Sequence, residues 1–141
     1  MNPIRVLVVD DEKDFATAVV ERLKRRGLLA AAAFGGREAL ESVSENEYDA
    51  VVLDLKMPGM DGLETLRAIR QMDPDIQVLV LTGHGTVSAG VDGMQLGAAD
   101  FLQKPVSIET LCASIEAAAD QSRFGRHSRL DQNEKPKGEK T

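Results

Sequence analysis

Short runs of apolar, often β-branched residues alternate along the chain with longer segments in which apolar residues recur at helical spacing. The short runs predict strands at 4–9, 28–33, 50–53, 76–81 and 100–102. The longer segments predict helices at 14–26, 37–45, 63–72, 87–96 and 108–121. Repeated strand–helix units of this kind predict an α/β fold, a parallel sheet with helices on both faces.

The predicted strands differ in how clearly the sequence marks them. The strongest are almost continuously apolar, as strands buried on both faces must be. Ala30 to Ala33 alone would favour a helix, so 28–33 is the weakest strand. Gly27 after a basic helix end and Pro74 after the third helix are typical helix stops.

The length of 141 residues fits a single domain, which we expect to span residues 1–121. Residues 122–141 are polar, basic and poor in large apolar side chains. We expect them to form a disordered polar basic tail or linker.

The charge is distributed unevenly: residues 1–121 carry a net charge of −9 and residues 122–141 a net charge of +3. An acidic body does not suit a phosphate backbone, so we expect no direct nucleic acid binding by this chain. The only cysteine, Cys112, excludes an intrachain disulfide and is expected to be a small helix residue. No apolar run approaches the ~20 residues that span a bilayer, and we expect a cytoplasmic protein without a membrane contact.

Chemically active residues lie at the ends of the predicted strands. Asp10 and Asp11 follow the first strand, Asp54 the third, Thr82 the fourth, and the fifth leads to Lys104. Ligands of open parallel sheets bind at this edge, and three carboxylates there repel one another unless a cation is present. Hard oxygen ligands at a water-accessible edge predict Mg²⁺ as the cofactor.

The acidic loop after the first strand argues against a backbone cradle for phosphate, which needs a loop rich in Gly, Ser or Thr there. The site suits phosphoryl transfer to a carboxylate instead. Asp54 would be the nucleophile, and Lys104 and the Thr82 hydroxyl would bind the remaining phosphoryl oxygens.

Residues 4–121 closely resemble the receiver domain of two-component response regulators. The resemblance rests on four motifs in the family's order: Val-Val-Asp10-Asp11-Glu, Asp54-Leu-Lys-Met-Pro58-Gly-Met-Asp-Gly62, Leu-Thr82-Gly-His and Asp-Phe101-Leu-Gln-Lys104-Pro105. It implies a chemotaxis-regulator-like, flavodoxin-like (βα)5 fold, doubly wound, with strand order 2-1-3-4-5.

The resemblance also implies what the site residues do. Asp54 would accept a phosphoryl group from a sensor histidine kinase or a phosphotransfer protein. Asp10, Asp11, Asp54 and the backbone carbonyl of Lys56 would hold Mg²⁺, with Asp11 a direct ligand. Lys104 would pair with phosphoryl oxygens, and the Lys104–Pro105 peptide bond would be cis.

Further implied roles concern switching and lifetime. Thr82 and Phe101 would be the switch residues, although a phenylalanine in a short strand also suits a plain core position. Lys56 and His84 would tune hydrolysis of the acyl phosphate, although both also suit a solvated loop. Glycines 90 and 93 would loosen the fourth helix. The fourth helix, fifth strand and fifth helix would control an output partner or a missing output domain, and could form a dimer.

Two other functions remain open on the sequence. A Mg²⁺-dependent phosphohydrolase would need an acid two residues beyond Asp54, where this chain has Lys56. A scaffold that only keeps the fold would be expected to have lost one of the site residues, and none is lost. We therefore expect a phosphoacceptor that catalyses its own phosphorylation and dephosphorylation, not a turnover enzyme.

Overall fold

The computed structural model describes residues 2–55, 61–83 and 92–134. They form a five-stranded sheet in which every paired strand is parallel, in the order β2-β1-β3-β4-β5. This confirms the expected fold class and strand order. The order reverses between β1 and β3, which places the carboxyl ends of these two central strands at the point where such sheets bind ligands.

The elements agree closely with the predicted ranges except at the C-terminus. The strands are β1 (Arg5–Val9), β2 (Leu29–Ala33), β3 (Ala50–Leu53), β4 (Gln77–Thr82) and β5 (Asp100–Gln103). The helices are α1 (Lys13–Arg25), α2 (Gly36–Glu45), α3 (Gly62–Met72) and α5 (Ile108–Glu134). Residues 92–95, in the predicted fourth helix, are also helical, while Gly90 lies outside the described residues.

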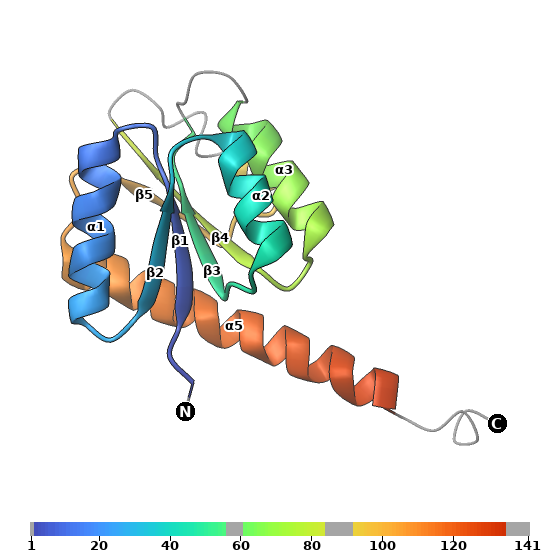
Figure 1. The fold of residues 1–141 in the computed structure, drawn as a ribbon. Helices are drawn as coiled ribbons and strands as arrows, with labels where there is room; N and C mark the ends of the chain where they lie inside the picture. The colour runs from blue at the N-terminus through green and yellow to red at the C-terminus, as the bar shows by residue number, and fades with distance from the viewer. Residues whose placement is uncertain (1, 56–60, 84–91, 135–141) are drawn as a thin grey trace.

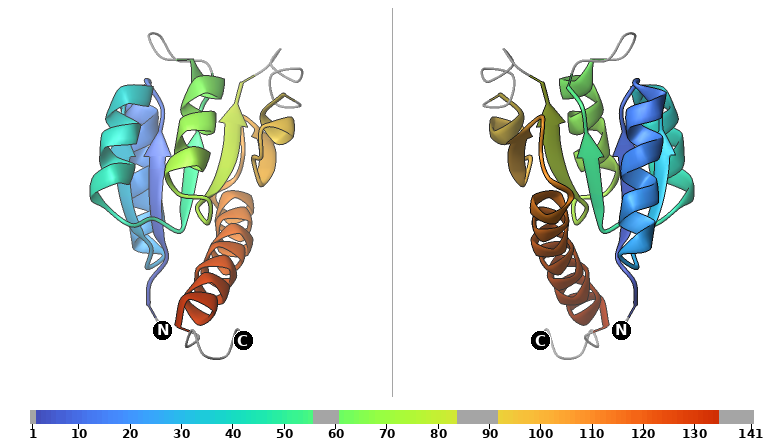
Figure 2. Two further views of the ribbon diagram at one scale, coloured as in Figure 1. Left: turned by 90° about the vertical axis from the view of Figure 1, so that its right-hand side faces the viewer. Right: turned by 90° about the vertical axis from the view of Figure 1, so that its left-hand side faces the viewer.

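Helices cover both faces of the sheet (Figures 1 and 2), and two clusters of apolar side chains fill the space between the sheet and these helices. One packs α1 and α5 against residues such as Val8 and Val52, and the other packs α2 and α3 against residues such as Leu7 and Val51. Successive strand residues point to opposite faces, so both faces of the sheet are buried. This explains why the central strands are apolar at nearly every position.

The alanine-rich segment is a strand, as the sequence analysis proposed. It pairs along its whole length with β1, from Arg5 beside Leu29 to Val9 beside Ala33. Leu28, just before it, is buried in the cluster beneath α1. Tertiary pairing with β1 therefore overrides the helical preference of alanine.

Gly27 ends α1 with a positive φ of 90°, a conformation that costs other residues energy. The amide of Gly27 donates to the carbonyl of Lys24, and the amide of Leu28 donates to that of Leu23 at 3.2 Å. The chain turns there from α1 directly into β2.

The C-terminal segment differs from the expectation. Residues 122–134 are not a disordered tail, because α5 continues through them without a break. Ser122 is fully buried. Residues 135–141 lie outside the described part of the chain.

Contacts with distant residues explain why this polar segment is helical. Arg123 donates to Asp49 at 3.1 Å and to the carbonyl of Pro3 at 2.8 Å. Arg126 donates to Asp73 at 2.7 Å and to the carbonyl of Tyr48 at 2.9 Å.

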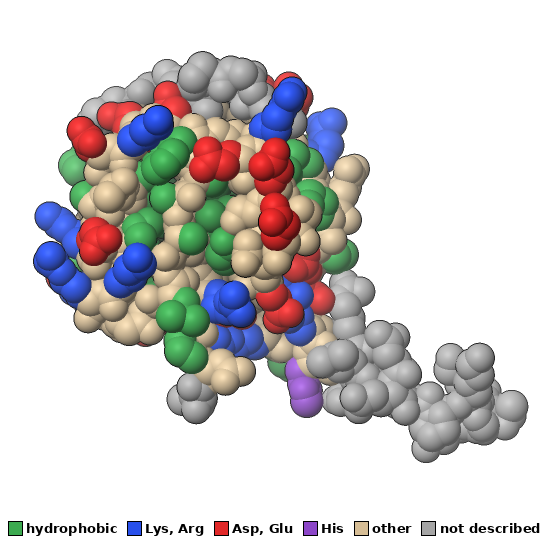
Figure 3. Space-filling view, viewed as in Figure 1, with side chains coloured by type: hydrophobic (Ala, Val, Ile, Leu, Met, Phe, Trp, Pro, Cys, Tyr) green, Lys and Arg blue, Asp and Glu red, His purple; other side chains and the backbone are tan. Residues whose placement is uncertain are grey.

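We call this arrangement of Arg123 and Arg126 with Asp49 and Asp73 the α5 clamp. It holds the helix across the edge of the sheet where the strands begin, and several Lys and Arg side chains lie along this lower part of the surface (Figure 3).

Replacing Arg126 by Met tests whether the clamp stabilises the domain. Met keeps an aliphatic stem but removes the hydrogen bonds to Asp73 and to the Tyr48 carbonyl. We expect the free energy of unfolding to fall by about 1–2 kcal/mol, because both acceptors are partly buried and one is charged. Urea denaturation measures it, with Arg25→Met on the exposed side of α1 as the control. Equal stability of the two variants would show that Arg126 contributes nothing to the stability of the domain.

Candidate functional site

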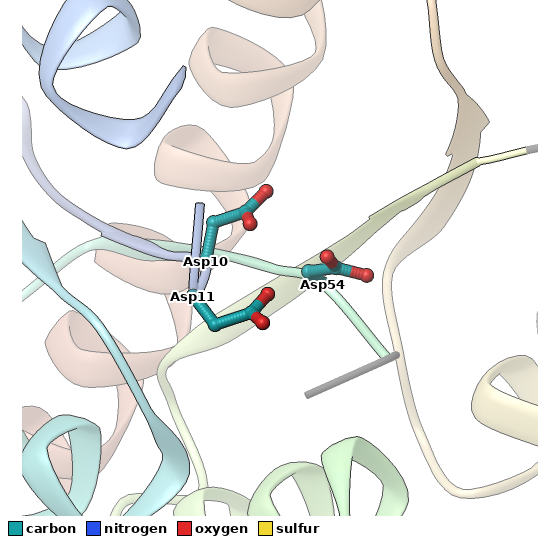
Figure 4. A group of neighbouring side chains, drawn as sticks. All are labelled: Asp10, Asp11 and Asp54. Carbon is teal, nitrogen blue, oxygen red and sulfur yellow. The ribbon is translucent and has the colours of Figure 1, made fainter. Parts of the chain in front are cut away.

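Three carboxylates meet at the edge of the sheet where β1 and β3 end. The side chains of Asp10, Asp11 and Asp54 lie close together at this edge (Figure 4). One carboxylate oxygen from each lies within 4.8 Å of the others. The three acids that the sequence analysis singled out are therefore neighbours in space.

The parallel pairing of β1 with β3 produces this arrangement. Val9 lies beside Leu53 in register, so both strands deliver their next residue to the same place. The amide of Asp54 donates to the carbonyl of Val9 at 3.0 Å, which extends the ladder by one residue. The backbone of the nucleophile candidate is thus held by the sheet and not by a loose loop.

The acids are not equally accessible. Asp10 is 2% exposed and Asp54 is 6% exposed, whereas Asp11 is more open to solvent. The amide of Glu12 donates to Oδ1 of Asp10 at 2.9 Å, which fixes the orientation of that carboxylate. Buried carboxylates need compensation from such donors and from nearby cations.

Lys104, which follows β5, supplies a cation to this group. Its Nζ donates to Oδ2 of Asp10 at 2.8 Å and lies 3.6 Å from Oδ2 of Asp54. Glu12 is also near, with its Oε1 at 3.5 Å from the same nitrogen. Lys104 therefore lies close to the acids, as the sequence predicted. The Lys104–Pro105 peptide bond is cis.

The charge state of Lys104 follows from these contacts. Burial by itself lowers the pKa of the ammonium group. The hydrogen bond to Asp10 and the negative charges of Asp10, Asp54 and Glu12 outweigh that effect and leave the pKa above its usual value. Lys104 is therefore a permanent cation at neutral pH.

The donor set fits a hard divalent cation. Three carboxylates and one ammonium leave a formal charge of −2, which one divalent ion would balance. Mg²⁺ prefers oxygen ligands, keeps several waters and commonly binds one or two carboxylates together with phosphate. The more exposed Asp11 is the acid best placed to face such an ion.

The start of α3 comes unusually close to the backbone that follows Asp54. A Cβ atom built on Gly62 would lie 2.6 Å from the carbonyl oxygen of Leu55, which is closer than atoms can pack. Asp61 caps the helix by accepting a hydrogen bond from the amide of Leu63. The Asp61-Gly62 pair therefore both begins α3 and supports the segment next to the nucleophile candidate.

The structure describes the other predicted site residues only in part. Thr82 ends β4 in register with Gln103, and only its backbone is described. Lys56 and His84, including the carbonyl proposed as a metal ligand, lie outside the described residues. Phe101 is half-buried on β5 and packs against the cluster beneath α3.

The helical residues 92–95 approach the sheet closely at Gly93, a glycine that was expected from the sequence to loosen the fourth helix. Gly93 is buried, and a Cβ atom there would lie 3.3 Å from a methyl group of Val80. Its small size thus permits close packing, besides any loosening of the helix.

Sequence reasoning missed two neighbours of Lys104. Glu12 was read only as part of an acidic loop, and Phe15 was not considered. The Nζ of Lys104 lies 4.3 Å from the centroid of the Phe15 ring. The sequence does place Phe15 only four residues after Asp11, near the start of a predicted helix. Its contact with Lys104 could not be read from this spacing, because the two residues are far apart in the sequence.

Cys112 is buried, which raises the pKa of its thiol and favours a packing role.

Comparisons with known proteins identify relatives of this chain. The sequence profile of the response regulator receiver domain matches residues 6–116. The transcriptional regulatory protein PrrA of Mycobacterium tuberculosis is 42% identical over 113 residues, which are 80% of this chain and 48% of PrrA. ZraR of Escherichia coli, also named a transcriptional regulatory protein, is 39% identical over 82% of this chain and 26% of its own length. The chain thus spans about half or less of these relatives.

A comparison with solved structures also finds a receiver domain. The crystal structure of a response regulator receiver domain protein from Clostridium thermocellum has a TM-score of 0.82 and 32% sequence identity, and the match covers 86% of this chain and 98% of that one. Within the described residues, no helix is both long and apolar enough to cross a membrane.

Proposed function

Since this chain belongs to the response regulator receiver family and contains a receiver domain of two-component signalling, we propose that Asp54 accepts a phosphoryl group in a reaction that requires Mg²⁺. The observation that carries the proposal is the meeting of three carboxylates with one lysine cation at the sheet edge. The donor would be a phosphohistidine of a sensor kinase or phosphotransfer protein.

In the proposed reaction a carboxylate oxygen of Asp54 attacks the phosphorus atom. A new oxygen–phosphorus bond forms while the nitrogen–phosphorus bond of the donor breaks, and the imidazole leaves with that electron pair. Asp10, Asp11 and Asp54 would hold the metal, which neutralises charge on the phosphoryl oxygens when bound. Lys104 would bind another phosphoryl oxygen from its position beside Asp54.

Phosphorylation would then act on a surface made by residues 92–95, β5 and the start of α5. Thr82 and Phe101 would relay the change, because Thr82 ends β4 and Phe101 lies beside Val80 on the next strand. The same surface would meet an output partner, an output domain or a second copy of the chain. The names of PrrA and ZraR support a transcriptional output.

Two competing functions are less well supported. A turnover phosphohydrolase would need a general acid two residues after Asp54, and Lys56 stands there. An inactive scaffold would not need to keep two buried acids beside one lysine, an arrangement that costs desolvation energy. We therefore propose a phosphorylated switch and not a turnover enzyme.

Removal of the metal tests the proposal. The protein is incubated with a small acyl phosphate in the presence of Mg²⁺ or of a chelator, and intact mass is measured over time. We expect a gain of one phosphoryl group with Mg²⁺ and at least a tenfold slower gain without it, because the metal offsets repulsion between the donor and three carboxylates. A rate that is independent of Mg²⁺ would contradict a metal-dependent site. If no donor, including kinase phosphohistidine, labels the protein, the scaffold function is favoured.

A further inference from the structure

The position of Lys104 depends on more than its acidic partners. Its ammonium group lies 4.3 Å from the centroid of the Phe15 ring, well within the ~6 Å at which a cation is attracted to an aromatic face. The lysine side chain is only 18% exposed, so water weakens this attraction less than it would at the surface. Phe15 projects from α1, whereas Lys104 follows β5.

A lysine has a flexible stem, and Lys104 has partners in two directions. Asp10 and Asp54 lie inside the site with side chains 3% and 8% exposed. Glu12 lies outside, with a side chain 68% exposed. A lysine held by carboxylates alone could turn toward Glu12 whenever the inner acids are engaged otherwise.

Phosphorylation would engage those inner acids. In the proposed reaction the Asp54 carboxylate would become an acyl phosphate, and Asp10 would be one of the residues that hold the metal. Among the described neighbours of the ammonium group, the Phe15 ring is the one that carries no charge and takes no part in these changes. The ring also packs against the apolar cluster between α1 and α5, which fixes its own position.

We propose that Phe15 is a positioning residue for phosphoryl transfer: its ring face keeps the ammonium group of Lys104 directed at the phosphoryl site. In this role the ring would act only through Lys104, as a positioning residue and not as a ligand of the donor or the metal. This inference rests on the proposed function, because the reaction it assists is phosphorylation of Asp54.

The test removes the ring face while keeping an apolar side chain. We expect Phe15→Leu to slow phosphoryl uptake from a small acyl phosphate about fivefold, the size of a partly desolvated cation–π contact. Phe15→Tyr keeps the aromatic face and should stay within about twofold of the unmodified chain. If Phe15→Leu does not fold, as judged by circular dichroism, Phe15→Met replaces it.

A matched control exists nearby. The Nζ of Lys13 lies 5.4 Å from the centroid of the Phe34 ring, and this ring packs against the same apolar cluster. Phe34→Leu thus removes an equal volume and another lysine–ring contact, but not one to Lys104. It should leave the rate of uptake unchanged.

Coupling to Lys104 separates positioning from a general structural effect. In a Lys104→Met background, Phe15→Leu should cause no further loss of rate, because the group that the ring orients is gone. An equal loss in both backgrounds, or an unchanged rate for Phe15→Leu alone, overturns the proposal.

A second readout does not depend on phosphorylation. Relaxation of the ¹⁵N nucleus of the Lys104 ammonium group, measured without any donor, should show greater mobility in Phe15→Leu than in Phe34→Leu. Equal mobility in the two variants overturns the positioning role even if the protein is phosphorylated normally. Failure of the unmodified chain to take up phosphate would instead contradict the proposed function, and the relaxation experiment would still decide whether Phe15 orients Lys104.

Discussion

Replacing Asp54 by Asn is expected to abolish phosphoryl uptake. The amide has nearly the same shape as the carboxylate but lacks the anionic oxygen that attacks phosphorus. Asp54 is 6% exposed and directly follows β3, and the residues of β3 itself include no carboxylate. Intact mass after incubation with Mg²⁺ and an acyl phosphate should show one phosphoryl group on the unmodified chain and none on the variant.

The fold should survive this substitution. Removing one of three neighbouring carboxylates reduces their mutual repulsion, which compensates for the loss of the contact with Lys104. Asp61→Asn is the matched control, because Asn also caps a helix and Asp61 is not one of the three grouped acids. Labelling that persists in Asp54→Asn would show that another residue is the nucleophile.

The same pair of proteins also tests the proposed output surface. Adding the donor should change amide hydrogen exchange in residues 92–95, β5 and the start of α5 of the unmodified chain. Asp54→Asn should show no such change. Changes confined to α1 and α2 would contradict the proposed surface.

Replacing Lys104 by Met is expected to slow phosphoryl uptake by about a hundredfold, the usual effect of losing one charged or polar donor to a developing anion. The ammonium group lies 2.8 Å from Asp10 and 3.6 Å from Asp54, and Met cannot supply a positive charge to either side. The remaining cluster carries a formal charge of −3, which should also repel an anionic donor. Single-turnover kinetics at saturating Mg²⁺ measure the rate.

A second substitution at position 104 separates the effect of charge from that of shape, and a substitution of another lysine serves as the control. Lys104→Arg keeps the charge but carries a larger planar group, and should recover only part of the rate. Lys13→Met removes a lysine whose Nζ lies above the Phe34 ring, and should have no effect. A Lys104→Met variant that is phosphorylated at the normal rate would show that Lys104 only balances charge in the unphosphorylated protein.

Local patterns in the sequence were sufficient for most of the fold. Nearly continuous apolar runs marked the central strands, and the structure places them where both faces are buried. The acids at 10, 11 and 54 could be grouped from the sequence because the carboxyl ends of parallel strands meet at one edge of the sheet. The strand at 29–33 was harder to predict, since pairing with β1 and not its own composition makes it extended.

The C-terminal half of α5 could not be predicted in this way. Its composition is polar and basic, which by itself favours disorder. Its helical state depends on Arg123 reaching Asp49, 74 positions earlier, and on Arg126 reaching Asp73. The Phe15–Lys104 contact was missed for the same reason, because neither residue alone indicates its distant partner.

The α5 clamp makes the last helix a lever with a fixed pivot. The helix begins four residues after Lys104 and is gripped at Arg123 and Arg126, beyond the opposite edge of the sheet. At 1.5 Å per residue, its 27 residues extend about 40 Å, and roughly 12 Å of that lies beyond Arg126. A tilt of about 5° around the clamp would move the far end of the helix by about an ångström, so a small rearrangement beside Lys104 would displace the opposite end of α5.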